Sequence, residues 1–181
     1  MLQQTQVARV TEYWPRFLAS FPTLADLAAA APQQVREAWD GLGYYRRAEH
    51  LRRAAGEMVT HHDGKVPRET AMLRTLPGVG RYTAGAVASF AYELAEPAID
   101  TNVHRVLRRA FHPRLRPGAA TDRTLWNTAK ALLPRRGDLA WTTNQALMEL
   151  GALVCTARVM HCDRCPVRAH CATGRAKPKP R

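Results

Sequence analysis

Hydrophobic residues recur every three or four positions along most of the chain, which is the spacing that one buried face of an α-helix requires. In the first helical segment the apolar positions are Val7, Val10, Trp14, Phe17 and Leu18. The same periodicity predicts helices over residues 3–20, 23–30, 32–41, 44–61, 69–75, 81–92, 101–110, 121–133 and 143–154. Strand-like alternation is not evident in any window, so we expect an all-α fold.

Glycine and proline divide this pattern into parts. Gly41-Leu42-Gly43 and Asp63-Gly64 interrupt it as turns, and Pro77-Gly78 ends a short helix. A chain of 181 residues fits one domain or two small lobes that share a cleft. We expect a helical lobe over residues 1–97 and a second lobe over 98–174, with a Lys/Arg/Pro-rich tail at 175–181 that is disordered.

The net charge of the chain also indicates what kind of partner it binds. The formal net charge is +12, and 23 of the 27 basic residues are arginine, whose planar fork grips phosphate in a bidentate manner. Such an excess indicates a polyanion, although a generally arginine-rich composition would give the same count. No run of about 18 apolar residues occurs. We therefore expect no membrane contact, a monomer, and a cytoplasmic, nucleoid-associated location if the protein is bacterial.

All the cysteines lie in one stretch near the end of the chain. Their spacing is C-x6-C-x2-C-x5-C, at Cys155, Cys162, Cys165 and Cys171. Clustered thiols in a chain without an export signal indicate metal ligands rather than disulfides. The set suits a [4Fe–4S] cluster or a structural zinc ion. Because the spacing differs from that of the ferredoxin runs, the general rules leave zinc open.

A second motif is the segment Leu76-Pro77-Gly78-Val79-Gly80, followed by a helix that begins at Arg81. Gly78 and Gly80 permit a tight turn, and the free amides and dipole at the start of a helix favour an anion such as phosphate. An ordinary joint between two packed helices would look similar. Asp100 follows 20 residues after Gly80 and precedes a helix, where a carboxylate also acts as an N-cap.

Together these stretches resemble the helix-hairpin-helix DNA glycosylase superfamily, most closely its adenine DNA glycosylase (MutY) branch. The matching segments are MLQQTQV at the start, GLGYY at 41–45, LPGVGRYTAGA at 76–86, DTNVHRVL at 100–107, NQALMELGALVC at 144–155, and the cysteines. The resemblance implies a two-lobed helical fold with a [4Fe–4S] cluster bound by the four cysteines. It also implies excision of adenine mispaired with guanine or 8-oxoguanine in double-stranded DNA.

The resemblance also implies roles for single residues. Asp100 matches the catalytic carboxylate, which stabilises the positive charge that develops on the sugar. Tyr82 and Asn102 match residues that support the sugar and this carboxylate. In the endonuclease III branch the position of Tyr82 holds a lysine that forms a Schiff base and allows strand cleavage. With tyrosine there, we expect a monofunctional enzyme, and the endonuclease III type of glycosylase/lyase is the alternative.

The remaining matches concern DNA. Gln4 and Tyr44 match wedge residues that fill the gap left by a flipped base, while Tyr44 would otherwise be interpreted as a core residue. Gly78, Gly80 and Arg81 in the hairpin and Arg158 in the cysteine loop match contacts to the backbone. The positions that match the lining of the adenine pocket are Leu2, Gln145 and Met148, of which the last two share a helix face.

The chain departs from the family at both ends. The glutamate that protonates the departing adenine lies two residues before the methionine of MLQQTQV, and the sequence begins at that methionine. The C-terminal domain that recognises 8-oxoguanine in most members has no counterpart in the sequence either. Two interpretations are open: a truncated version of a full glycosylase, or a shortened, non-catalytic DNA-binding paralogue. Under either, we expect this chain to bind DNA and to release adenine slowly or not at all.

Overall fold

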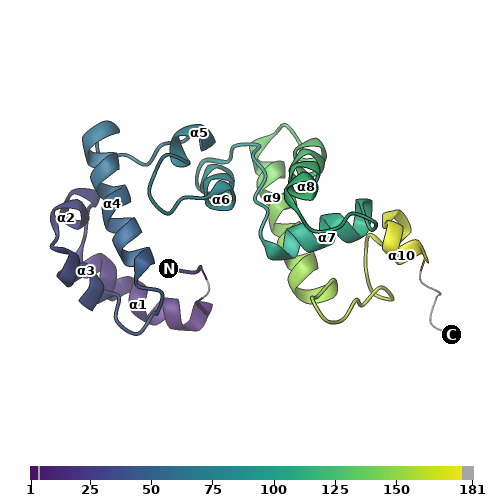
Figure 1. The fold of residues 1–181 in the computed structure, drawn as a ribbon, viewed down its shortest axis with the longest axis horizontal. Coiled ribbons are helices and arrows are strands. Elements are labelled where there is room, and N and C mark those ends of the chain that lie inside the picture. Colours follow the sequence, from purple (N-terminus) through teal and green to yellow (C-terminus); the bar gives the residue numbers. More distant parts are fainter. Residues whose placement is uncertain (4, 177–181) are drawn as a thin grey trace. The chain divides into compact units, whose positions relative to one another are not determined.

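The computed structural model describes residues 1–3 and 5–176, and their regular structure is helical (Figure 1). Within these residues the β-type pairing is limited to one isolated antiparallel bridge between Cys155 and Met160. The expected all-α class is therefore confirmed for this part of the chain. The contacts divide the chain into two compact units, unit 1 from Met1 to Gly80 and unit 2 from Arg81 onward.

Unit 1 packs two short helices against one long helix. Its helices are α1 (Val7–Ser20), α2 (Leu24–Ala29), α3 (Pro32–Ala38), α4 (Arg46–His61) and α5 (Thr70–Leu73). Both α2 and α3 lie against α4 (Figure 1). The core centres on Trp39 and Phe17, which meet edge to face with ring centroids 5.7 Å apart. Trp39 also donates its indole N–H to the Gly43 carbonyl, so the core residue holds the following loop.

Unit 2 is built around helix α7. Its elements are α6 (Arg81–Tyr92), α7 (Thr101–Phe111), α8 (Ala119–Leu132), α9 (Gly137–Glu149), the π-helical turn η1 (Leu150–Val154), the 3₁₀ turn η2 (Arg168–His170) and α10 (Ala172–Ala176). Helix α7 contacts α8, α9, η1 and α10. Leu107 on α7 and Leu125 on α8 are fully buried at its apolar centre.

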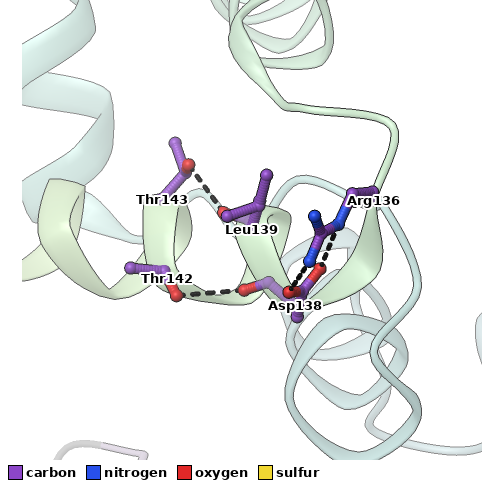
Figure 2. Close-up of polar contacts among 5 residues, drawn as sticks. All are labelled: Arg136, Asp138, Leu139, Thr142 and Thr143. Atoms are coloured by element: carbon purple, nitrogen blue, oxygen red, sulfur yellow. Dashed lines mark hydrogen bonds and ion pairs between the residues drawn. The ribbon is translucent and has the colours of Figure 1, made fainter.

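Four expected helix starts differ from the structure by two or more residues. The first helix begins at Val7 rather than at residue 3, and the fourth begins at Arg46 rather than Tyr44. Helix α8 begins at Ala119 rather than at residue 121, and α9 begins at Gly137 rather than Thr143. At α9 the Arg136 side chain binds the Asp138 carboxylate at 3.1 and 2.6 Å across the first turn (Figure 2). Gly137, the first residue of α9, is required by packing, because a Cβ there would lie 1.5 Å from the Glu93 carbonyl oxygen.

The unit boundary also lies earlier than the lobe boundary expected near residue 97. Helix α6 belongs to unit 2 because it packs closely on the segment that leads to α7. A Cβ on Gly85 would lie 1.9 Å from the Pro97 carbonyl oxygen, so helix and segment touch through their backbones. The division of function between two lobes stays a prediction.

Within the described residues, no helix has the length and apolar character needed to cross a membrane.

Candidate active site and cysteine cluster

Asp100 is the N-cap of α7, and its two carboxylate oxygens have different partners. One oxygen accepts the backbone N–H of Val103 at 2.7 Å, and the other accepts the Asn102 side-chain amide at 2.8 Å. The capping interpretation of Asp100 is therefore confirmed. The two bonds fix the carboxylate in one orientation at the start of α7 and leave each oxygen able to accept another hydrogen bond. A catalytic role for Asp100 stays a prediction.

A chain of hydrogen bonds runs from Asp100 to the first cysteine. Asn102 accepts a bond of 2.8 Å from the Arg105 guanidinium, which also donates to the carbonyl oxygens of Gly151 at 2.7 Å and Cys155 at 2.9 Å. Gly151 has to be glycine, since a Cβ there would lie 2.7 Å from Cβ of Asn102. The expected partner Asn102 thus lies beside Asp100. Arg105, which the sequence analysis missed, connects this carboxylate to the cysteine loop.

Tyr82 lies on α6 near the first turn, and 37% of its surface is exposed. Burial, and secondly the negative charge of Asp100, raise the pKa of the Tyr82 phenol. The supporting role expected for Tyr82 stays a prediction. At neutral pH the phenol keeps its proton and is available as a hydrogen-bond donor.

The four cysteines are free thiols that line one shared, partly open cavity. Burial raises the pKa of the Cys165 thiol, and the other three cysteines contribute to the same direction. The four side chains surround the space without converging on a point: in the described part of the chain, no three His, Cys, Asp or Glu residues are grouped as ligands of one metal ion.

Arg109 holds both ends of this cysteine motif. Its guanidinium donates to the carbonyl oxygens of Cys155, Thr156 and Ala157 and lies 3.3 Å from the Cys155 sulfur. Its own carbonyl accepts the Thr173 hydroxyl at 2.7 Å and the Cys171 thiol at 3.8 Å. Arg105 and Arg109 are four residues apart on one face of α7. Their spacing indicates a shared helix face but does not indicate the carbonyl oxygens that they bind.

Only one of the two hairpin glycines is required by the turn itself. Gly78 has a positive φ of 75°, and a Cβ there would lie 2.7 Å from Cβ of His50. A Cβ on Gly80 would meet no atom within 4 Å, and its φ is not in the left-handed region. The backbone and its packing therefore require glycine at Gly78 but not at Gly80, and the DNA contacts expected of both stay predictions. The Arg81 guanidinium stacks on the Trp126 ring, 3.9 Å from its centre.

The expected wedge residue Tyr44 lies on the surface of unit 1. It is 62% exposed and has a positive φ of 50°, which a bulky side chain rarely adopts. The alternative interpretation of Tyr44 as a core residue is therefore wrong. Leu2 is 59% exposed. Gln4, the other expected wedge residue, lies outside the described residues.

The remaining expected residues are in unit 2. Gln145 and Met148 are half-buried on α9, and Met148 packs against the apolar core that includes Ile99 and Val103. Arg158 is exposed in the loop between the first two cysteines. Next to it, Thr156 closes a turn by bonding both the carbonyl and the N–H of Val159. The roles of Leu2, Gln145, Met148 and Arg158 stay predictions.

Asn144 is a further residue that the sequence analysis passed over. It is 2% exposed, and its side chain bonds three groups in unit 2: the Ser89 hydroxyl, the Glu96 carbonyl and the Ala98 N–H. These bonds satisfy the irregular backbone just ahead of Asp100. Its position in the segment NQALMELGALVC gave no separate signal for this role.

Residues 1–134 match the family model for the HhH-GPD superfamily base excision DNA repair protein. The chain is 48% identical over 171 residues to the adenine DNA glycosylase of Mycolicibacterium smegmatis, covering 94% of this chain and 57% of that protein. It is 45% identical over 175 residues to the adenine DNA glycosylase of Homo sapiens, covering 94% and 31%. The chain thus spans about a third to just over half of the length of these relatives.

Solved structures agree with this match. A thermostable thymine-DNA glycosylase superposes with a TM-score of 0.84 at 26% identity, covering 96% of this chain and 80% of that one. The protein in a non-covalent endonuclease III–DNA complex superposes with a TM-score of 0.80 at 26% identity, covering 96% and 79%. The resemblance noted in the sequence is confirmed at the level of the family: the chain belongs to the HhH-GPD superfamily of base excision DNA repair proteins.

Proposed function

We propose that this chain carries the DNA-binding and base-excising part of an adenine DNA glycosylase. The reaction is hydrolysis of the N-glycosidic bond of adenine opposite 8-oxoguanine or guanine, with the DNA strand left intact. The observation that carries this proposal is the Asp100 carboxylate, held at the start of α7 by Asn102 and its own helix. The identity of 48% to an adenine DNA glycosylase supports the choice of base.

Asp100 acts on the sugar in this proposal. Breaking the N-glycosidic bond leaves positive charge on the deoxyribose, and a carboxylate in fixed orientation stabilises that charge or forms a covalent bond with it. The two hydrogen bonds that hold Asp100 keep it oriented before the substrate arrives. Preorganisation of this kind costs little rearrangement during the reaction.

Tyr82 accounts for the absence of strand cleavage. A lyase needs an amine that attacks the sugar and forms a Schiff base, and a phenol cannot do so. Because burial and the Asp100 charge raise its pKa, Tyr82 stays protonated and can donate a hydrogen bond to a sugar or phosphate oxygen. The matches to endonuclease III structures leave the lyase as the alternative that the experiment must address.

We also propose a [4Fe–4S] cluster bound by Cys155, Cys162, Cys165 and Cys171. The fit rests on four free thiols that line one cavity and that, among the described residues, are not grouped around a single ion, which suits a cluster with one cysteine at each iron better than one zinc ion. When bound, the cluster would supply a rigid cross-link for the loop from residue 155 to 171. Arg109 holds the Cys155 end of this loop from α7.

DNA contacts follow from exposed groups in both units. The turn at Gly78 leads into α6, and the open space around Gly80 lets a phosphate approach the start of that helix closely. Arg158 projects from the cysteine loop towards solvent. Tyr44, exposed and strained, suits insertion into a base stack. We assign Gln145 and Met148 to the adenine pocket, because an amide offers adenine both a donor and an acceptor.

The direct test is adenine release from duplex DNA with adenine opposite 8-oxoguanine. Two proteins are compared: the 181-residue chain and a version extended ahead of Met1 by a helix that carries a glutamate two residues before it. We expect the extended version to release adenine and leave an abasic site. Asp100→Asn in that version should abolish release and leave binding intact, since the change removes the charge and keeps the shape. The unextended chain should bind and release adenine about 10²–10⁴ times more slowly.

The other outcomes identify the alternatives. Strand cleavage with a covalent adduct trapped by borohydride would favour the endonuclease III type of reaction. Binding with no base release by either version would favour a non-catalytic DNA-binding protein. Equal rates for the two versions would contradict the assigned need for an upstream acid.

A further inference from the structure

We propose that Arg47 is a positioning residue that fixes the two segments of unit 1 expected to meet a damaged base pair. These segments are residues 1–3 and 5, on either side of the expected wedge residue Gln4, and residues 42–44, which end at Tyr44. The assignment deepens the proposed function and rests on it for the role of these segments in DNA. Arg47 is not expected to touch the reacting atoms.

The guanidinium of Arg47 collects oxygens from both segments. One terminal nitrogen donates to the carbonyl of Met1 at 2.7 Å and also to the carbonyl of Gln3. The other donates to the Thr5 hydroxyl at 2.9 Å and to the carbonyls of Leu42 at 3.2 Å and Gly43 at 3.1 Å. Thr5 also links the two segments directly, since its hydroxyl donates to the Leu42 carbonyl at 3.3 Å.

Arg47 and the oxygen atoms that it binds in the two segments are called the clamp below. Aromatic contacts connect this clamp to Tyr44 itself. The Arg47 guanidinium lies 5.4 Å from the ring centre of Trp39 and 5.4 Å from that of Tyr44. Trp39 is fully buried in the core, whereas Tyr44 is 62% exposed. Arg47 therefore connects the rigid interior of unit 1 to the exposed ring. An exposed aromatic with a positive φ needs such support, because its backbone conformation is unfavourable by itself.

Folding stability alone does not explain why an arginine occupies position 47. The Nε atom of Arg47 is buried and has no hydrogen-bond partner among the described residues, which is a cost to folding. A partly buried cation is weak evidence for stabilisation, since an apolar residue of similar volume is often as good. The arginine fork instead supplies donors in a fixed geometry that neither lysine nor methionine reproduces. These features favour a role in holding geometry.

The experiment compares Arg47→Lys and Arg47→Met with Arg46→Met. Arg46 is the adjacent residue and is exposed, so its replacement removes the same positive charge and leaves the clamp in place. Without DNA, hydrogen exchange measured by mass spectrometry should become faster in residues 1–6 and 40–45 for both Arg47 variants. Exchange in α2 should stay unchanged in all three, which reports that unit 1 remains folded.

With DNA, the measurement is the ratio of affinities for a duplex containing adenine opposite 8-oxoguanine and for a plain duplex. Both Arg47 variants should lower this ratio about tenfold, because the two segments lose their fixed orientation. The charge that Arg47→Met also removes should weaken both affinities alike. Arg46→Met should weaken both affinities equally and leave the ratio unchanged.

Two results would overturn the inference. The first is full rescue by Arg47→Lys, which would assign the residue a role of charge alone. The second is faster hydrogen exchange in the two segments together with an unchanged ratio of DNA affinities. That result would mean that Arg47 stabilises the segments without contributing to recognition of the mispair. If the unaltered chain itself does not distinguish the two duplexes, the proposed function fails, whereas the exchange rates still decide whether Arg47 holds the two segments.

Discussion

Units 1 and 2 are both helical, but their interiors differ in kind. The buried aromatic residues Phe17 and Trp39 lie in unit 1, and among the described residues the buried polar side chains lie in unit 2, at Ser89, Thr121 and Asn144. Unit 2 brings irregular backbone close to its interior ahead of Asp100 and around the cysteines. Its backbone polar groups need partners there, and polar side chains supply them.

In both units, however, arginine side chains hold the segments to which we assign a function. In unit 1, Arg47 binds carbonyl oxygens of two loops. In unit 2, Arg105 and Arg109 bind carbonyl oxygens of the cysteine loop. Arginine is suited to this task because it donates several bonds in fixed directions. The comparison teaches that part of the high arginine content serves the fold, so the net charge overstates the number of arginines that DNA can meet.

Replacing Cys162 with serine should have the largest effect and should be confined to unit 2. We expect loss of about four irons per chain and of the brown colour of anaerobically purified protein, because one ligand of the proposed cluster is removed. Hydrogen exchange should rise in residues 155–171. Val159→Ala is the matched control, since Val159 is exposed in the same loop and does not line the cavity. Stoichiometric zinc with no visible absorbance in the unaltered protein would contradict the cluster assignment.

Replacing Trp39 with alanine tests the aromatic interior of unit 1. Removing a buried tryptophan should lower the free energy of unfolding by about 3–5 kcal/mol. Hydrogen exchange should increase across α1, α3 and α4. The iron content should stay as in the unaltered protein at temperatures where unit 2 remains folded. An equal rise in exchange across α7 would show that the interiors of the two units are not separate.

Replacing Asn144 with leucine tests the polar interior of unit 2. The change keeps the approximate size and leaves the Glu96 carbonyl and the Ala98 N–H buried without a partner, at a cost on the order of 2–3 kcal/mol. Thr142→Val is the control on the same helix, because the Thr142 hydroxyl bonds only its own helix at Asp138 and is exposed (Figure 2). That change should cost about 0.5 kcal/mol or less. Similar losses for both variants in urea denaturation would argue against the buried network.

Much of this architecture is predictable from the sequence, for reasons that are local. Helical periodicity places α6, α7 and α8 within a few residues of their observed bounds. The N-cap at Asp100 and the turn at Gly78 follow from side-chain and backbone chemistry that needs no tertiary information. The grouping of the four cysteines around one cavity follows from their short spacing.

The contacts that the sequence does not predict are those between distant segments. Arg47, Arg105 and Arg109 look like any other basic residue on a helix, because their carbonyl partners are set by how loops return to the helix. Gly137 is a poor helix former by local propensity, although it begins α9 because only glycine fits against the Glu93 carbonyl. The unit boundary at Gly80 depends in the same way on the backbone contact between Gly85 and Pro97.

The smallest expected effect comes from a glycine in unit 1. Gly56 lies within α4, and a Cβ there would meet no atom within 4 Å. Gly56→Ala should therefore raise the free energy of unfolding by about 0.5–1 kcal/mol, because alanine restricts the unfolded chain and favours the helix. In unit 2 the same change at Gly85 should have the opposite sign and cost about 1–3 kcal/mol, since the new Cβ would overlap the Pro97 carbonyl. Urea denaturation followed by circular dichroism measures both. If Gly85→Ala were as well tolerated as Gly56→Ala, the close backbone packing that assigns α6 to unit 2 would be wrong.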